Sequence, residues 1–298
     1  MDYDVNFKCV LDTGEEIPKE AVKMAGVKFP DVHKNAKDMA VLSKSIREYN
    51  EDLFSIVPFC MTVEAEALGG EINLGDEKAG PRVSTYTFKS IEDIKGLKEI
   101  DFETKRMGEV LKSVEILKKE GETVIMDVQG PFTIISSLID PRIFYKAVRK
   151  NKDEVERLME IVEKSSVEFI KEGVKRGVDI ISFGDSAGTL DILGPKMYKE
   201  LGGKYTYNVL KEAKNYLEDS IIHLCGITSS SLDRAGFIKS NPIEVPEGIT
   251  YGQALNYIIK ENKDVKILGH NCLRKTAKPM NKSVVCLLYT SPSPRDTR

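Results

Sequence analysis

The sequence is missing the features that mark several large classes of protein. None of its apolar runs approaches the ~18 residues that a membrane-spanning helix requires. Its first residues do not form the apolar stretch of a secretory signal. The 44 basic and 47 acidic residues nearly balance, so no basic face for nucleic acid is expected. These absences predict a soluble protein that binds neither membranes nor nucleic acid.

Cysteine and histidine are also scarce, with five and three residues in a chain of 298. The cysteines are too widely spaced to form a disulfide framework. A reducing cytoplasm is therefore the expected compartment, and there cysteine more often serves catalysis or metal binding. Cys9 and Cys60 stand in no informative pattern and are expected to be inert structural residues.

Two His-x-Cys triplets contain two of the three histidines and two of the five cysteines. The first runs from His223 to Cys225 and the second from His270 to Cys272, and each follows an apolar run. Imidazole and thiolate are preferred ligands of zinc, and residues i and i+2 of a strand share a face. Either triplet alone could be a buried histidine beside a small apolar cysteine. The presence of both favours a metal site.

Short apolar runs alternate with helical patterns through the central part of the chain. A helix is expected from Asn151, which forms a capping-box pattern with Glu154, to a stop at Gly177. Further helices are expected at about 195–217 and around 253–259. The expected strands are 55–59, 124–128, 178–183, 221–224, 241–245 and 265–268.

This alternation predicts an α/β fold with a parallel sheet. Without a glycine-rich nucleotide motif, a (β/α)₈ TIM barrel is favoured over a doubly wound sheet. Polar residues follow the strands, at the end where barrel enzymes place their chemistry. They are Gln129, Asp185, His223, Cys225, Glu244, His270 and Cys272.

Three regions are expected along the chain. Residues 1–50 form an N-terminal helical arm, with Val32, Ala36, Met39 and Ile46 facing inward, and residues 51–285 form the barrel. Residues 286–298 depart in composition from everything before them and resemble a translated cloning adapter. We therefore expect them to contribute nothing to folding, and the natural C-terminus to be truncated or replaced.

Four segments resemble the uroporphyrinogen decarboxylase superfamily, and within it the methylcobamide:coenzyme M methyltransferase branch. They are residues 58–69 (PFCMTVEAEALG), 127–133 (DVQGPFT), 179–185 (DIISFGD) and 223–226 (HLCG), of which the last resembles the start of a zinc motif. The decarboxylase itself is metal-free and surrounds its substrate with basic side chains. Its N-terminal Arg-Gln-Ala-Gly-Arg stretch is absent here.

The resemblance implies transfer of a methyl group from a methylated corrinoid protein to a small thiol such as coenzyme M. Zinc would bind the thiol and favour its thiolate form. His223, Cys225 and Cys272 are the implied ligands, although the branch has its second cysteine further downstream, so the third ligand could instead be lost with the C-terminus. His270 could be a fourth ligand or only a neighbour.

The remaining polar residues are weaker candidates. Asp185 would act in catalysis as a proton acceptor or by orienting a ligand, or it would be a hydrogen-bonded helix cap. Glu244 would act as a displaceable oxygen ligand. Gln129 and Glu64 would contact the methylcobamide cofactor or be buried structural residues. Two other functions stay open: a uroporphyrinogen decarboxylase-type tetrapyrrole decarboxylase, and a non-catalytic corrinoid or thiol binder.

Overall fold

The computed structural model describes residues 17–97, 100–103 and 105–290. Its seven-stranded sheet has the order β1-β4-β5-β6-β8-β9-β7, and β2 and β3 form a separate antiparallel pair. The strands are β1 Ser55–Val57, β2 Glu71–Asn73, β3 Arg82–Thr85, β4 Val124–Gln129, β5 Ile180–Gly184, β6 Ile221–Cys225, β7 Ile238–Glu244, β8 Ile267–Asn271 and β9 Val284–Thr290.

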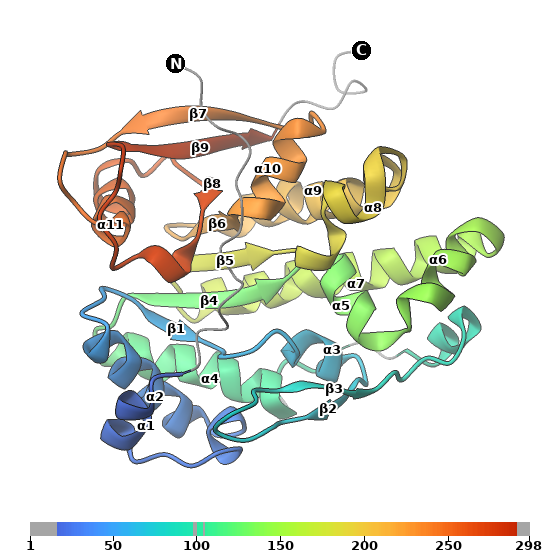
Figure 1. Ribbon diagram of the computed structural model, residues 1–298, viewed down its shortest axis with the longest axis horizontal. Coiled ribbons are helices and arrows are strands. Elements are labelled where there is room, and N and C mark those ends of the chain that lie inside the picture. Colours follow the sequence, from blue (N-terminus) through green and yellow to red (C-terminus); the bar gives the residue numbers. More distant parts are fainter. Residues whose placement is uncertain (1–16, 98–99, 104, 291–298) are drawn as a thin grey trace.

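Helices surround this sheet (Figure 1). The longer ones are α1 Lys19–Ala25, α2 Ala36–Tyr49, α4 Lys105–Lys119, α5 Pro131–Leu138, α6 Pro141–Lys150, α7 Lys152–Lys175, α8 Leu190–Met197, α9 Gly203–Ala213, α10 Gly226–Arg234 and α11 Tyr251–Glu261. The shorter ones are α3 Val63–Ala67, η1 Asp31–His33, η2 Ile91–Gly96, η3 Ser186–Gly188, the π-helical η4 Tyr198–Gly202, η5 Lys214–Tyr216 and η6 Leu273–Lys275. No helix in the described ranges is long and apolar enough to cross a membrane.

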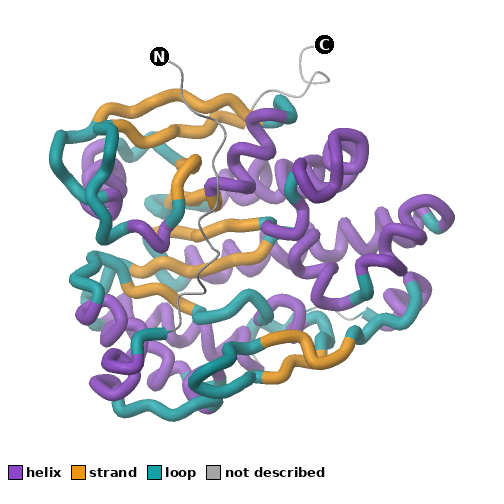
Figure 2. The backbone as a smooth tube through the Cα atoms, in the orientation of Figure 1, coloured by secondary structure: helices purple, strands orange, loops and turns teal. Residues whose placement is uncertain are grey.

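The parallel part of the sheet confirms the α/β prediction. Strands β1, β4, β5, β6 and β8 pair in parallel, each with its neighbour in that order. Figure 2 shows these strands stacked through the centre of the molecule. β1 and β7 end the strand order, and no pairing among the described residues joins them, so closure into a complete barrel is not seen.

The two faces of this sheet pack against different helices. Met126, Phe183 and Leu224 point to one face, where they are buried against α4, α7 and α9. Ile125, Ile180 and Ile221 point to the other and are buried with apolar residues of α11. This second surface is called the α11 face below. Alternation along each strand places residues 125, 127 and 129 on it together.

The far edge of the sheet corrects two expectations. The predicted strand 241–245 corresponds to β7, but β7 pairs antiparallel with β9 instead of joining the parallel strands. β9 contains Cys286, Leu287 and Leu288, and it also pairs with β8. Leu288 is buried. The expectation that the chain from 286 onward takes no part in the fold is therefore wrong for residues 286–290, and residues 291–298 lie outside the described ranges.

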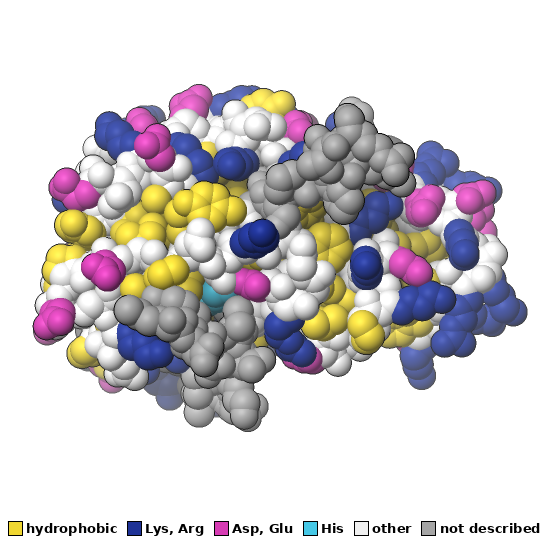
Figure 3. Space-filling view, turned by 90° about the horizontal axis from the view of Figure 1, so that it is seen from above, with side chains coloured by type: hydrophobic (Ala, Val, Ile, Leu, Met, Phe, Trp, Pro, Cys, Tyr) yellow, Lys and Arg dark blue, Asp and Glu magenta, His cyan; other side chains and the backbone are white. Residues whose placement is uncertain are grey.

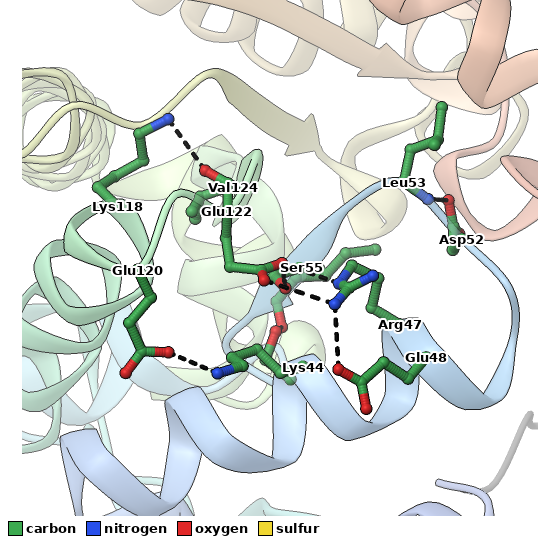
Figure 4. A network of polar contacts seen from close by, with 12 residues as sticks. Lys44, Arg47, Glu48, Asp52, Leu53, Ser55, Lys118, Glu120, Glu122 and Val124 are labelled. Carbon is green, nitrogen blue, oxygen red and sulfur yellow. Dashed lines mark hydrogen bonds and ion pairs between the residues drawn. The ribbon is translucent and has the colours of Figure 1, made fainter.

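Helices α1, η1 and α2 precede β1, and residues 1–16 of the predicted N-terminal arm lie outside the described ranges. Val32, Ala36 and Met39 are buried, while Ile46 is only partly buried. Polar contacts fasten α2 to the segment that leads into β4 (Figure 4). Lys44 Nζ lies 2.7 Å from Glu120 Oε2, and Arg47 Nε lies 2.8 Å from Glu122 Oε2. These ion pairs lie at the amino end of β4, opposite the end that carries Gln129.

Asn151 occupies the N-cap position of α7, but it does not form the predicted capping box. Its side chain accepts no hydrogen bond from the first turn of the helix. It donates instead from Nδ2 to Glu92 Oε1 at 3.1 Å, which connects α7 to η2. A long-range partner has therefore displaced the local one. The helix ends as expected before Gly177, which has a φ of +82° that favours glycine.

Candidate functional site

Strand register assembles polar residues into a row across the α11 face. Asp127 of β4 pairs with Ser182 of β5, and Ser182 pairs with His223 of β6. Asp127 and Ser182 are partly exposed, although their strand neighbours Met126, Val128, Ile181 and Phe183 are buried. Solvent therefore reaches this face of the sheet near its carboxyl end, whereas the opposite face is sealed by helices.

A second row lies one step further toward the carboxyl ends of the strands. Gln129 pairs with Gly184, and Cys225 pairs with Asn271 of β8. The register between β6 and β8 shifts before Cys225. Cys272 directly follows β8, and both Cys225 and Cys272 are partly exposed. The structure therefore brings Cys225 and the end of β8 to neighbouring positions.

His223 is the most enclosed residue of the predicted metal set. Its exposed fraction is 1%, and its Nε2 lies 2.6 Å from the hydroxyl oxygen of Tyr251 in α11. Burial lowers the pKa of His223 to about 3, so its imidazole is neutral at pH 7. Burial raises the pKa of Tyr251, and the thiols of Cys286 and Cys272 add to the increase.

The predicted ligands match zinc in donor type but not in arrangement. Neutral imidazole and thiolate are the groups that zinc prefers, and His223 and Cys225 share a strand. Within the described ranges, however, no three His, Cys, Asp or Glu side chains converge closely enough to hold a metal ion. His223 directs Nε2 to Tyr251 instead. A preformed three-ligand site at His223, Cys225 and Cys272 is not present in this arrangement.

His270 belongs to a different polar cluster. Its backbone N–H donates to Ser229 Oγ at 2.9 Å, and its Nδ1 lies 3.0 Å from the same oxygen. Its Nε2 lies 3.4 Å from Asp233 Oδ2. Both partners are on α10. Its φ of +58° is unusual for a residue with a side chain, and these contacts hold it there. The ring therefore contacts α10, while Asn271 faces Cys225.

Asp185 lies just after β5 and has its carboxylate fully occupied. It accepts hydrogen bonds from the amides of Phe132 and Thr133, at 3.1 and 2.8 Å, and from the hydroxyls of Thr133 and Thr206, at 2.9 and 3.1 Å. Gly130 packs so closely that a Cβ there would lie 2.3 Å from Asp185 Cβ. Asp185 is thus a buried carboxylate at the start of α5, which corresponds to the helix-cap alternative.

Two carboxylates at this end of the sheet have raised pKa values: Glu64, which is buried, and Asp127, which belongs to the first row. Glu64 Oε1 accepts the Gln129 amide at 2.7 Å. Burial, reinforced by the charge of Asp127, raises the pKa of Glu64 to about 7, against the lowering effect of that amide. Burial raises the pKa of Asp127 to about 6, while Ser182 and Arg274 oppose the shift. Both groups therefore titrate close to neutral pH.

Arg106 fixes the segment that carries Glu64. Its guanidinium is 4% exposed and lies 2.5 Å from Glu66 Oε2. It also donates to the Thr62 hydroxyl at 2.8 Å and contacts Cys60 Sγ at 3.3 Å. The three partners lie in α3 or directly before it. Cys60 is therefore a packing and hydrogen-bonding residue, consistent with its expected structural role.

Glu244 is placed away from these groups. It ends β7, where it is exposed and pairs with Val284 of β9. Strands β8 and β9 separate β7 from β6 in the sheet. The structure therefore does not bring the Glu244 carboxylate into the rows that contain His223 and Cys225.

Several residues at the site were not singled out by sequence reasoning. Asp127 and Gln129 are two residues apart in one strand, so the alternation that places Gln129 at the site also places Asp127 there. Ser182 follows from the same alternation in β5. Tyr251 and Arg106 come from helices far away in the sequence. No local pattern marks their contacts with His223 or with the segment before α3.

Comparison with known proteins identifies the family. The model for uroporphyrinogen decarboxylase (URO-D) matches residues 8–273. The chain belongs to the uroporphyrinogen decarboxylase family. This confirms the resemblance noted in the four sequence segments, and the match covers every strand of the parallel sheet from β1 to β8.

Two curated proteins that are similar to this chain have the same name. The methylcobamide:CoM methyltransferase MtbA of Methanosarcina mazei is 28% identical over 266 residues, covering 86% of this chain and 76% of that protein. MtbA of Methanosarcina acetivorans is 26% identical over 271 residues, covering 88% and 80%. A solved methyltransferase structure from Methanosarcina mazei has the same fold, with a TM-score of 0.61 at 24% identity, covering 69% of this chain and 60% of that one.

Proposed function

We propose that this chain transfers a methyl group from a methylated corrinoid protein to a small thiol such as coenzyme M. One structural observation carries the proposal: His223 and Cys225 share a face of β6, and Cys225 lies opposite the end of β8 that leads into Cys272. Two curated relatives with similarity across most of the chain are named methylcobamide:CoM methyltransferases. The names of these relatives support a thiol as the acceptor.

Each residue has a proposed part in this reaction. His223, Cys225 and Cys272 are proposed to hold zinc, which when bound would stabilise the thiolate form of the acceptor. Gln129 and Glu64 are proposed to contact the corrinoid at the carboxyl end of β4. The neutral, buried His223 is in the protonation state that a metal ligand requires.

Two residues receive revised proposals. The four hydrogen bonds accepted by Asp185 support a positioning role at the start of α5 instead of proton transfer. Glu244 is exposed on the outer strand and is proposed to contact the corrinoid protein, not the reacting thiol.

The test compares two cysteine variants. Cys225→Ala should abolish methylation of coenzyme M by methylcobalamin and reduce zinc per chain, because it removes a thiolate donor. Cys60→Ala should keep wild-type zinc content, since Cys60 contacts Arg106 and Thr62 away from the β6–β8 junction. Zinc is measured by elemental analysis and methylation by loss of the methylcobalamin absorbance. A zinc-replete, active Cys225→Ala enzyme would contradict the proposal.

A tetrapyrrole decarboxylase is the second candidate, favoured by the family match itself. Such an enzyme needs cationic side chains for the many carboxylates of its substrate. Uroporphyrinogen incubated with the purified wild-type protein separates the two functions, because product would show fewer carboxylates by mass spectrometry. Decarboxylation together with an inactive methyl-transfer assay would replace the first proposal with this one.

A further inference from the structure

Asp127 has an unusual position for a carboxylate within a central strand. Its neighbours in β4, Met126 and Val128, are fully buried under helices on the opposite face. Asp127 points to the α11 face and keeps partial exposure there. It is in register, through Ser182, with His223. A carboxylate in this place has no role in the packing of the apolar core.

The surroundings of Asp127 leave its carboxylate with few partners. Ser182 is its hydrogen-bonding neighbour, and the exposed Arg274 of η6 supplies a positive charge from a distance. Glu64 of α3 approaches closely enough for the two negative charges to interact. This contrasts with Asp185, whose oxygens accept four hydrogen bonds. Asp127 therefore retains oxygen lone pairs for a ligand that enters this face.

We propose that the Asp127 carboxylate accepts the proton of the incoming thiol, an assignment that rests on the methyl transfer proposed above. The S–H bond breaks and its proton moves to an Asp127 oxygen. The sulfur electron pair forms the new bond to the methyl carbon. The electron pair of the cobalt–carbon bond stays with the corrinoid, and Asp127 later releases the proton to solvent.

The raised pKa of the Asp127 carboxylate suits it to accept the proton of a thiol. Thiols have a pKa near ~8.5, so most of a free thiol at neutral pH keeps its proton. A base that is ionised at pH 7, yet not far below it in pKa, takes up such a proton well. Asp127, with a pKa raised to about 6, meets both conditions. Glu64, whose pKa is raised to about 7, is close enough for its charge to interact with that of Asp127.

The experiment follows the pH dependence of coenzyme M methylation with free methylcobalamin as donor. Wild-type kcat/KM should fall as the pH drops through about 6, because protonated Asp127 cannot accept a proton. Asp127→Asn should lose this dependence and reduce kcat by about 10²-fold or more. Ser182→Ala removes the hydrogen bond that favours the ionised carboxylate, so it should move the same limb to higher pH.

Asp179→Asn is the matched control. Asp179 precedes β5 at the opposite end of the sheet, where it accepts hydrogen bonds from Lys118 Nζ at 2.6 Å and the Val124 amide at 2.7 Å. This variant should be less stable but keep the wild-type pH profile. Thermal unfolding and circular dichroism verify that the variants are folded.

The outcomes separate this assignment from the proposed function. If the wild-type protein methylates coenzyme M while Asp127→Asn retains its rate and its acid limb, the proton-acceptor assignment is overturned and the methyltransferase proposal stands. If the wild-type protein, with zinc present, methylates no thiol, the proposed function fails and the assignment falls with it. A shifted limb in Ser182→Ala together with a lost limb in Asp127→Asn supports both.

Discussion

Carboxylates at the carboxyl end of this sheet differ in how many hydrogen bonds they accept. Asp185 accepts four, from two backbone amides and two hydroxyls, and has no free capacity. Glu64 accepts the backbone amides of Gln129 and of Glu64 itself. Asp127 has Ser182 as its hydrogen-bonding neighbour. Saturated groups of this kind hold structure, whereas unsaturated ones near solvent are available for chemistry.

Asp185→Ala should destabilise the protein by about 3–5 kcal/mol, because several buried donors would lose their acceptor at once. The matched control is Asp191→Ala. Asp191 forms an exposed ion pair with Arg234 at 2.9 Å, and its loss should cost less than about 1 kcal/mol. Urea unfolding of both variants measures the difference. Equal costs would show that the four bonds to Asp185 contribute little.

At the scale of secondary structure, β9 connects two parts of the sheet that would otherwise be separate. It pairs with β8 on one side and β7 on the other. Leu288 belongs to the main apolar core, which also contains Leu232 and Ile238, whereas Tyr289 is 48% exposed. Val285 alternates onto the same side as Tyr289 but is buried with the apolar residues of α11, so both sides of β9 are partly covered.

Leu288→Ala should lower the free energy of unfolding by about 2–4 kcal/mol, since it removes buried methyl groups and leaves a cavity. Tyr289→Ala, on the opposite side of the same strand, should cost about 1 kcal/mol or less. The two variants share the same backbone pairing, so their difference isolates packing. Thermal and urea unfolding would reveal it, and an unchanged Leu288→Ala protein would restore the view that this segment is dispensable.

The local sequence pattern predicts the positions of strands more readily than it predicts which strands pair with one another. The apolar runs located β4, β5 and β6 to within one or two residues, because buried parallel strands have a strong compositional signal. The pattern predicts a strand at 241–245, but the atypical composition of residues 286–298 conceals most of its neighbour β9. An atypical composition does not prevent a segment from packing. Packing depends on whether side chains such as Val285 and Leu288 fit the apolar core, and both are buried.

The same distinction applies to the site. The apolar runs place His223, Cys225 and Gln129 near the carboxyl ends of their strands, and strand alternation and register put them on one face of the sheet. Tyr251, which forms a hydrogen bond with His223, belongs to α11. No local sequence pattern reveals that this helix packs against the sheet at His223. The convergence of three metal donors depends on such docking too, so the spacing of His and Cys residues alone could not establish it.

At the scale of the whole molecule, protection should decrease from the centre of the sheet toward its edges. β4, β5 and β6 are buried almost throughout, while most of β7 is partly or fully exposed. Hydrogen exchange measured by mass spectrometry should therefore show the slowest amides in 124–129, 180–184 and 221–225, and faster exchange in 238–244. Equal protection of 238–244 would mean that the sheet opens as a single unit.

The charges of the molecule are also unevenly distributed. Figure 3 shows basic side chains gathered at one end, the end that α6 occupies in Figure 1. Arg142, Lys146, Arg149 and Lys150 are all exposed on this helix. Because the net charge of the chain is −3, the remaining surface is on balance more acidic. Long-range electrostatic forces should therefore steer an acidic partner toward the α6 end of the molecule, and added salt should weaken this steering.

The two edge strands of the sheet, β1 and β7, affect how readily copies of the protein aggregate. Open strands invite a second copy to add its own strand. β1 is only three residues long, and the Ser43 hydroxyl of α2 donates to its Ile56 carbonyl at 2.9 Å. β7 contains Pro242, which has no amide hydrogen to offer, and the exposed Lys239. Both borders are thus poor templates for sheet extension, which protects the protein against aggregation at high concentration.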